Sequence, residues 1–270
     1  MFQSLKEIFF DHLHNIPQIF KMAKSDLIKT YRGAALGWSW AIIRPCVTIF
    51  TYWFTFSVGL RSGRPVNGTP FFLWLLCGLV PWFYMRDMLN VGTESFRRYK
   101  HLVTKMKFPI SIIPTFVSVS KMMVSLVLIA VVCITFWLMG YPPTLYWLQI
   151  PLYVVLSFIF FTLWGQFSSL ISAISSDFAN LVKSFITPLF WLSGILWRSD
   201  NFEGSVWVKR FLEVNPITYL IGGFRECFIF GKWFWEDYNE LLYFGCMTLI
   251  LWALSLWAYK KLRKEIPDVL

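Results

Sequence analysis

Charged residues are scarce in this sequence of 270 residues: Asp, Glu, Lys and Arg make up 15% of it, against about 25% in an ordinary soluble domain. Hydrophobic residues make up 57% and aromatic residues 20%. A soluble domain of this length could not hide that much apolar surface, so lipid must supply part of the solvent. The composition therefore predicts a polytopic membrane protein.

Closely spaced cysteines and the motifs of common enzymes are also missing. The five cysteines stand singly with no CxxC spacing, which disfavours metal and redox sites and favours small apolar packing residues. There is no GxxxxGK[ST] loop to bind nucleotide phosphates, and no DxD, HExxH or GxSxG pattern. His12, His14 and His101 are interpreted as surface or interface residues. We expect no catalytic site, no metal and no cofactor in this chain.

Carboxylates are missing from the middle of every apolar stretch, which disfavours a proton-driven carrier. Lys and Arg outnumber Asp and Glu, with a formal net charge of +10. They cluster at the ends of apolar stretches rather than along one face, so no nucleic-acid partner is expected. An excess of Lys and Arg marks the cytoplasmic loops, and it places both termini and the 89–109 loop on that side.

Apolar stretches are abundant, and six approach the length of about 20 residues that a membrane-spanning helix needs. The predicted fold is therefore all-α, a single transmembrane domain over residues 1–270 with six spans. The spans are predicted at residues 41–60, 70–88, 110–139, 145–171, 178–197 and 241–259.

The first 32 residues read as amphipathic helices rather than as a span. Apolar residues recur at helical spacing with polar residues between them, as in Leu5, Ile8 and Phe9. Pro17 suits the first turn of a second helix. We predict that residues 1–32 lie in the cytoplasmic membrane interface.

Residues 94–109, ESFRRYKHLVTKMKFP, alternate cations with apolar side chains between the second and third predicted spans. Nucleic acid, a membrane surface and a protein partner are the candidate ligands of such a segment. Residues 215–231, NPITYLIGGFRECFIFG, are apolar but too short and too interrupted to span comfortably. They predict an external re-entrant segment between spans five and six, covered by protein.

Aromatic residues are more abundant than membrane-interface belts require. Aromatic rings can stack on the apolar face of a sugar without a fixed hydrogen-bond pattern, which favours a conduit for a sugar polymer. The candidate conduit residues are Trp38, Trp40, Tyr52, Phe56 and Trp74.

Three stretches then carry a resemblance to one family. Residues 31–45, YRGAALGWSWAIIRP, resemble the start of the first span in the membrane subunits of polysaccharide-exporting ABC transporters. Residues 104–114, TKMKFPISIIP, are similar to the segment before their third span, and residues 215–226, NPITYLIGGFRE, to their external Asn-Pro motif. The likeness is strongest to wall teichoic acid exporters, with O-antigen and capsule exporters as near relatives. The matching residues of the first stretch are Arg32, Gly37, Trp40 and Pro45.

The resemblance implies a homodimer in the bacterial cytoplasmic membrane, bound to two separate ATPase subunits that hold ATP and Mg. The cargo would be an anionic or neutral polymer on undecaprenyl diphosphate, passing between the two protomers among membrane lipids. Residues 92–107 would form a coupling helix that docks on the ATPase. Its candidate contacts are Phe96, Arg97, Arg98, Tyr99, Lys100 and Leu102.

The resemblance also implies a cytoplasmic gate near residues 17–32 and an external gate at residues 215–231. Charge alone nominates the diphosphate contacts of the cytoplasmic gate, which are Lys24, Lys29, Arg32 and Arg44. The external gate residues are Asn215, Pro216, Arg225 and Glu226. The competing hypotheses are an ATP-independent carrier or flippase for lipid-linked sugars, a membrane-embedded sugar transferase and a structural scaffold.

Overall fold

The computed structural model describes residues 2–33, 35–60, 63, 65–105, 108–196, 212, 214–263 and 265–266. Over these ranges every regular element is helical, and the one extended pairing is an isolated bridge between Val66 and Thr69. The helices are α1 (Phe2–His14), α2 (Ile16–Tyr31), α3 (Trp40–Phe54), α4 (Phe71–Asp87), α5 (Ser95–Arg98), α6 (Lys100–Lys105), α7 (Ile113–Leu138), α8 (Ile150–Ile174), α9 (Ser176–Leu192), α11 (Pro216–Arg225) and α12 (Tyr238–Leu262).

Short 3₁₀ or π turns extend several of these helices, and five of the extended helices are long and apolar enough to cross a membrane. This confirms the all-helical prediction and five of the apolar helices on which it rests. The fifth predicted span, 178–197, corresponds to α9, which has 17 residues, ends at Leu192 and is not among these five long helices. Trp197, at the end of that predicted span, lies outside the described residues. The five long helices cover Gly37–Gly59, Phe71–Gly92, Ile110–Leu138, Leu145–Ile174 and Tyr238–Leu262.

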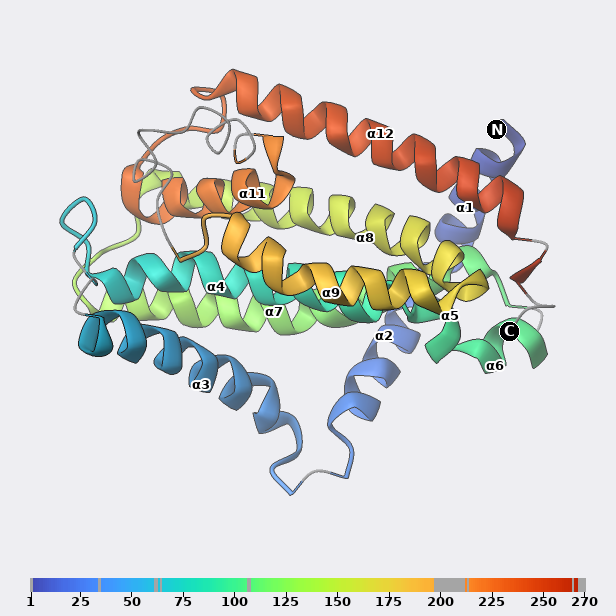
Figure 1. The fold of residues 1–270 in the computed structure, drawn as a ribbon, viewed down its shortest axis with the longest axis horizontal. Helices are drawn as coiled ribbons and strands as arrows, with labels where there is room; N and C mark the ends of the chain where they lie inside the picture. Colours follow the sequence, from blue (N-terminus) through green and yellow to red (C-terminus); the bar gives the residue numbers. More distant parts are fainter. Residues whose placement is uncertain are drawn as a thin grey trace.

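Helix α4 is the central element of the bundle, in contact with α3, α7 and α11. It is buried continuously from Leu73 to Met85. Its sequence, FFLWLLCGLVPWFYMRD, is apolar on all sides, as expected for a helix surrounded by others. Helix α3 differs, since only Ala41 and Ile49 are buried along its length. In Figure 1, α2 and α3 form a V that projects from the bundle.

The two ends of the bundle hold different elements (Figure 1). One end carries α1, α5, α6, the start of α7 and the end of α12. The opposite end carries α11, the start of α4 and the start of α12. The N-terminal helix, the basic segment and the end of α12 therefore share one end of the molecule, while the Asn-Pro segment lies at the other.

Two helix boundaries can be compared with the sequence prediction, and one of them differs from it. Residues 92–107 do not form one helix, because Tyr99 leaves the helical conformation between α5 and α6. The break turns the Tyr99 ring inward, edge-on against Phe116 at 4.8 Å between centroids. Residues 106 and 107 lie outside the described part of the segment. At the N-terminus, α2 begins at Ile16 with Pro17 in its first turn, which confirms that start.

Candidate functional site

A cavity of about 250 Å³ lies between α2, α3, α4 and α7, at the end of the bundle that carries α5 and α6. We call it the cationic pocket because four basic side chains and only one carboxylate line it. The carboxylate belongs to Asp87. The basic residues are Arg44, Arg86, Arg98 and Lys121.

The charges in the cationic pocket are only partly compensated. Arg86 forms an ion pair with Asp87 at 3.2 Å. Arg44 lies over the Trp40 ring at 5.5 Å, and neither Arg44 nor Lys121 has an ion-pair partner among the residues that the structure describes. Burial and the nearby Asp87 raise the pKa of Tyr31, so its phenol remains a neutral donor. The pocket therefore has an excess of positive charge and suits an anionic group.

Asp26 of α2 connects this pocket to the basic segment. Its side chain is fully buried, and three donors from other elements surround it. The Tyr99 hydroxyl donates to Oδ1, and the Ser120 hydroxyl donates to Oδ2 at 2.6 Å. The Arg98 guanidinium lies 3.3 Å from Oδ1. A buried carboxylate is tolerated when it is paired and hydrogen-bonded in this way.

The protonation state of Tyr99 fits this arrangement. Burial first, and then the hydrogen bond to Asp26, raise the pKa of Tyr99 well above its usual range. The phenol therefore keeps its proton and acts as a donor to the carboxylate. This bond ties α2 to the break between α5 and α6.

The basic segment, residues 94–105, is anchored to the bundle on its other side as well. Arg97 donates through Nε to the carbonyl of Ser172 at 2.6 Å, at the end of α8. A cation there complements the free carbonyls of a helix C-terminus. Glu94 pairs with Lys183 of α9 at 2.5 Å. The segment is therefore held by α2, α7, α8 and α9 together.

At the opposite end, the Asn-Pro segment clamps the turn that follows α9. Asn215 accepts from the backbone N–H of Ile217 as the N-cap of α11, and its Nδ2 donates to Ser193 at 2.9 Å. Arg225, at the far end of α11, donates to the carbonyls of Gly194 and Ile195, both at 2.7 Å. Both polar ends of α11 thus hold the same three-residue turn.

The Arg225 side chain is buried against α4. Its guanidinium carbon lies 3.7 Å from the centre of the Trp74 ring, a close cation–π contact. Gly78 makes room for it, because a Cβ there would lie 2.8 Å from Arg225 Nη2 and 3.1 Å from the Ile195 carbonyl oxygen. A glycine is therefore required where α4 passes this clamp.

Glu226 follows Arg225 and receives a hydrogen bond from the Tyr153 hydroxyl at 3.3 Å. Burial first, and then the nearby acids Asp237 and Glu240, raise the pKa of Glu226, while the Tyr153 hydrogen bond and Lys232 lower it, and the resulting pKa is about 7. This carboxyl therefore titrates near neutral pH.

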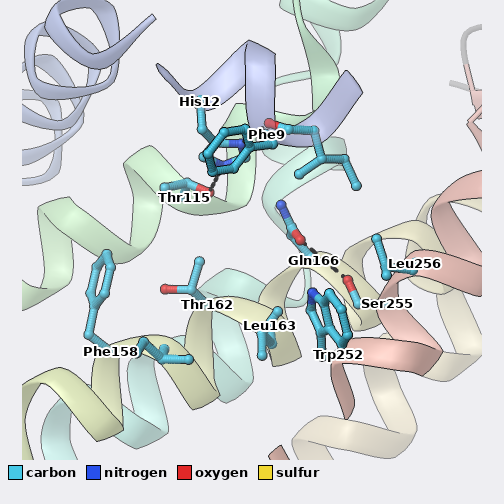
Figure 2. Close-up of a pocket in the computed structure, with 12 residues that line it drawn as sticks. Phe9, His12, Thr115, Phe158, Thr162, Leu163, Gln166, Trp252, Ser255 and Leu256 are labelled. Carbon is cyan, nitrogen blue, oxygen red and sulfur yellow. Dashed lines mark hydrogen bonds between the residues drawn. The ribbon is translucent and has the colours of Figure 1, made fainter. Parts of the chain in front are cut away.

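A second cavity, of about 370 Å³, lies beneath α1 between α7, α8 and α12 (Figure 2). Its polar groups bond to one another. His12 contacts Thr115 at 2.8 Å through Nε2, and Ser255 donates to Gln166 at 3.3 Å. The remaining lining is mainly apolar, including Phe9 and Trp252. His12 is therefore a part-buried residue that fixes α1 to α7, and the cavity offers an apolar surface.

Comparison with known proteins identifies the family of this chain. The sequence model of the ABC-2 type transporters matches residues 17–229. The chain belongs to the ABC-2 type transporter family. It is also similar to proteins named O-antigen export system permease protein RfbA. The one from Myxococcus xanthus is 24% identical over 241 residues, 88% of this chain and 89% of the relative. One from Klebsiella pneumoniae is 27% identical over 263 residues, 95% of this chain and 98% of the relative.

In this ABC-2 transporter chain, only one of the predicted diphosphate contacts lines the cationic pocket. Arg44 does so, whereas the other three are exposed and lie outside its lining: Lys24, Lys29 and Arg32. The sequence analysis missed Asp26, and it did not predict that the cations Arg86, Arg98 and Lys121 would meet in this pocket. A signal for Asp26 exists, since it shares one helical face with the buried Ile19 and Ala23.

The predicted ATPase contacts divide into buried and exposed residues. Phe96, Tyr99 and Leu102 are buried within the ABC-2 chain itself. Their apolar surface is used to hold the segment in place, so they cannot face a partner in this conformation. Arg97 and Arg98 bond to α8 and α2. Arg98 is nevertheless partly exposed, and the other exposed residues of the segment whose burial is described are Lys100, His101 and Thr104.

The predicted conduit aromatics lie in different environments. Trp74 is buried inside the protomer beneath Arg225, so its ring has no face open to a polymer. Tyr52 packs on Phe190 at 5.2 Å. Phe56 packs on Phe71 at 6.1 Å. Trp40 lines the cationic pocket, and Trp38 is exposed.

Proposed function

We propose that this chain is the membrane permease of an ATP-driven exporter that moves a lipid-linked polysaccharide across the bacterial cytoplasmic membrane. Membership of the ABC-2 transporter family and similarity to O-antigen export permeases support this function. The observation that carries it is the cationic pocket, which lies beside the basic segment that would meet the ATPase.

The lipid diphosphate would bind in the cationic pocket. Arg44 and Lys121 have no ion-pair partner within the described ranges, so they are available to neutralise phosphate oxygens. A guanidinium binds phosphate through two parallel N–H donors, and an ammonium binds it as a point charge. The undecaprenyl chain would remain in the bilayer beside α2 and α3.

The ATPase would dock at the basic segment through its exposed residues. Lys100, His101 and Thr104 face outward, while the buried residues beside them keep the segment rigid. ATP and Mg would be held by the separate ATPase subunit. Two ATPase subunits would serve a dimer of this chain.

The second copy would bind at the exposed apolar face of α3 and α9. Val47, Phe50 and Phe54 of α3 are exposed at helical spacing, as are Leu181 and Phe185 of α9. The Tyr52–Phe190 contact joins these two helices. The polymer would pass between the two protomers, and α9 would be the fifth of six spans. The positive-inside rule would place both termini and the cationic pocket in the cytoplasm.

The most specific part of the proposal is the class of polymer that is exported. The curated relatives favour an O-antigen polysaccharide, whereas the resemblance of residues 104–114 favours wall teichoic acid. Expression in two deletion strains, one lacking each type of permease, distinguishes them. Each strain must also receive the ATPase gene from this system, and surface polymer is then measured.

Purification from the native membrane in a mild detergent tests the function itself. We expect an ATPase with a phosphate-binding loop to co-purify at a one-to-one ratio, in a complex sized for two copies of each. A chain that purifies alone and transports lipid-linked sugar without ATP would overturn the proposal in favour of an ATP-independent flippase.

A further inference from the structure

We infer that Arg98 is a charge switch that reports the occupancy of the cationic pocket to the ATPase docking surface. A phosphate-bearing headgroup in the pocket would draw the Arg98 guanidinium away from Asp26. The inference rests on the proposed function, because it concerns the regulation of that same pocket.

Arg98 is placed to exchange one anion for another. Its Nη2 lies 3.3 Å from Asp26 Oδ1 and 3.4 Å from the Thr30 hydroxyl, and its side chain also lines the cationic pocket. The side chain is 37% exposed, whereas that of Asp26 is fully buried. The arginine can therefore rotate toward the pocket, while the carboxylate stays in place.

Asp26 can tolerate the loss of this partner. Ser120 and Tyr99 continue to donate to its two oxygens after Arg98 leaves. A buried carboxylate with hydrogen bonds to both oxygens is much less unfavourable than one without partners. The energetic cost of switching is therefore limited, as a reversible switch requires.

The other charged groups of the pocket do not offer Arg98 an equivalent partner. Asp87 is the only carboxylate in the lining, and Arg86 already pairs with it. Arg44 and Lys121 are cations, which repel Arg98 while the pocket is empty. A bound phosphate would outweigh this repulsion, because its negative charge attracts the Arg98 guanidinium into the pocket.

The switch lies within the segment that would touch the ATPase. Arg98 ends α5, Tyr99 forms the break, and Lys100 begins α6 as an exposed residue. Arg97 keeps the other side of α5 fixed to the end of α8. Release of Arg98 from Asp26 therefore loosens α2 from the segment without detaching the segment from the bundle.

The test uses the complete complex with its ATPase in lipid nanodiscs, titrated with undecaprenyl diphosphate. Binding is measured with a photoactivatable analogue, and ATP hydrolysis is measured in parallel. We expect binding to stimulate wild-type hydrolysis about fivefold, a change as large as the smallest typical effect of one site on the affinity of another. Arg98→Gln should still bind the diphosphate at saturation but lose the stimulation, and Arg98→Lys should restore part of it.

Two further variants distinguish the loss of a positive charge from the specific loss of the Arg98 switch. Arg86→Gln removes another pocket cation, so it should weaken binding while leaving the maximal stimulation intact. Lys21→Gln removes an exposed cation of α2 outside the pocket and should match the wild type. Full stimulation in Arg98→Gln, or wild-type binding without stimulation, would overturn the switch. A wild-type complex that binds no diphosphate would instead overturn the pocket assignment in the proposed function.

Discussion

Tyr99 illustrates how single residues hold together the end of the bundle that carries α5 and α6. It is buried, it interrupts the basic segment, and its hydroxyl donates to a buried carboxylate. A hydrogen bond to a charged group contributes more than one between neutral groups, about 1.5–3 kcal/mol. Removing only the hydroxyl leaves the packing on Phe116 unchanged.

We therefore expect Tyr99→Phe to lower the free energy of unfolding by about 1–3 kcal/mol. The measurement is thermal or denaturant unfolding of the purified chain in detergent. Tyr243→Phe is the matched control, because that side chain is exposed on α12 and should change stability little. Equal stability of the two variants would show that the Tyr99–Asp26 bond contributes nothing.

Gly78 is needed because the space beside it on α4 is too small for a larger side chain. Gly78→Ala places a methyl group against Arg225 and the Ile195 carbonyl, and such overpacking typically costs about 1–3 kcal/mol. Gly245→Ala of α12 is the control, because its Cβ would meet nothing within 4 Å. We expect a lower melting temperature for the first variant and an unchanged or higher one for the second. A Gly78→Ala protein as stable as the wild type would contradict the clamp.

The raised pKa of Glu226 predicts that stability depends on pH at the end of the bundle that carries α11. Its pKa is raised from 4.5 to about 7, so the folded state binds the proton more tightly than the unfolded state. The stability that this proton confers is complete below about pH 4.5 and is lost as the pH rises through about 7.

Glu226→Gln keeps the side chain neutral, so we expect it to be more stable than the wild type at pH 8 by roughly 1–2 kcal/mol. The advantage should vanish at pH 5. Unfolding curves at both pH values measure it, with Glu265→Gln as an exposed control that follows the wild type. A constant difference between Glu226→Gln and the wild type at the two pH values would contradict the assignment.

At the scale of elements, the long apolar helices could be predicted because their signal is local. The span predicted at residues 70–88 appears as α4, Phe71–Asp87, since an uninterrupted apolar run needs no knowledge of its neighbours. The break at Tyr99 could not be predicted in this way. It depends on contacts with α2 and α7, which are distant in sequence, and α5 has only four residues.

The residues of the cationic pocket also divide into one that local sequence could nominate and others that only the packing of distant helices brings together. Arg44 could be proposed from its position near the start of a predicted span. Arg86, Arg98 and Lys121 join it only through the packing of three other helices. The charge of each residue is visible in the sequence, but their meeting place is not.

Helix α3 carries the clearest prediction for an element. Cys46 is exposed and lies one turn from Phe50 on the face proposed to meet a second copy. A short thiol crosslinker applied to membranes should therefore produce a covalent dimer. Cys46→Ser should abolish the dimer, whereas Cys246→Ser, which changes the exposed cysteine of α12, should retain it. Dimers that persist without Cys46 would place the interface elsewhere.

At the scale of the whole molecule, the fold separates the proposed site of lipid and ATPase binding from the clamp at the opposite end of the bundle. The cationic pocket and the basic segment share one end of the bundle, and the Asn215–Arg225 clamp occupies the other. Helix α4 connects them, since its first half packs against Arg225 and its last turn carries Arg86 and Asp87. A movement of α4 would therefore change the contacts of the clamp and the shape of the cationic pocket together.

Assembly with the ATPase tests directly whether the basic segment is the docking surface. Lys100 is exposed in the basic segment, the proposed docking surface, and makes no ion pair among the residues described, so its charge is available to an acidic partner surface. We expect Lys100→Glu to reduce co-purification of the ATPase about tenfold, which corresponds to about 1.4 kcal/mol. Exposed charge pairs are screened by salt, so the wild-type interaction should also weaken at high ionic strength.

Lys21→Glu makes the same charge change on exposed α2 and is the matched control for that measurement. Thermal unfolding of both variants must match the wild type, because neither side chain is buried. Recovery of the ATPase at wild-type levels with Lys100→Glu would show that the docking surface lies outside the basic segment, residues 94–105. The remaining surface at that end of the molecule would then be α1 and the end of α12, where Arg263 pairs with Glu7.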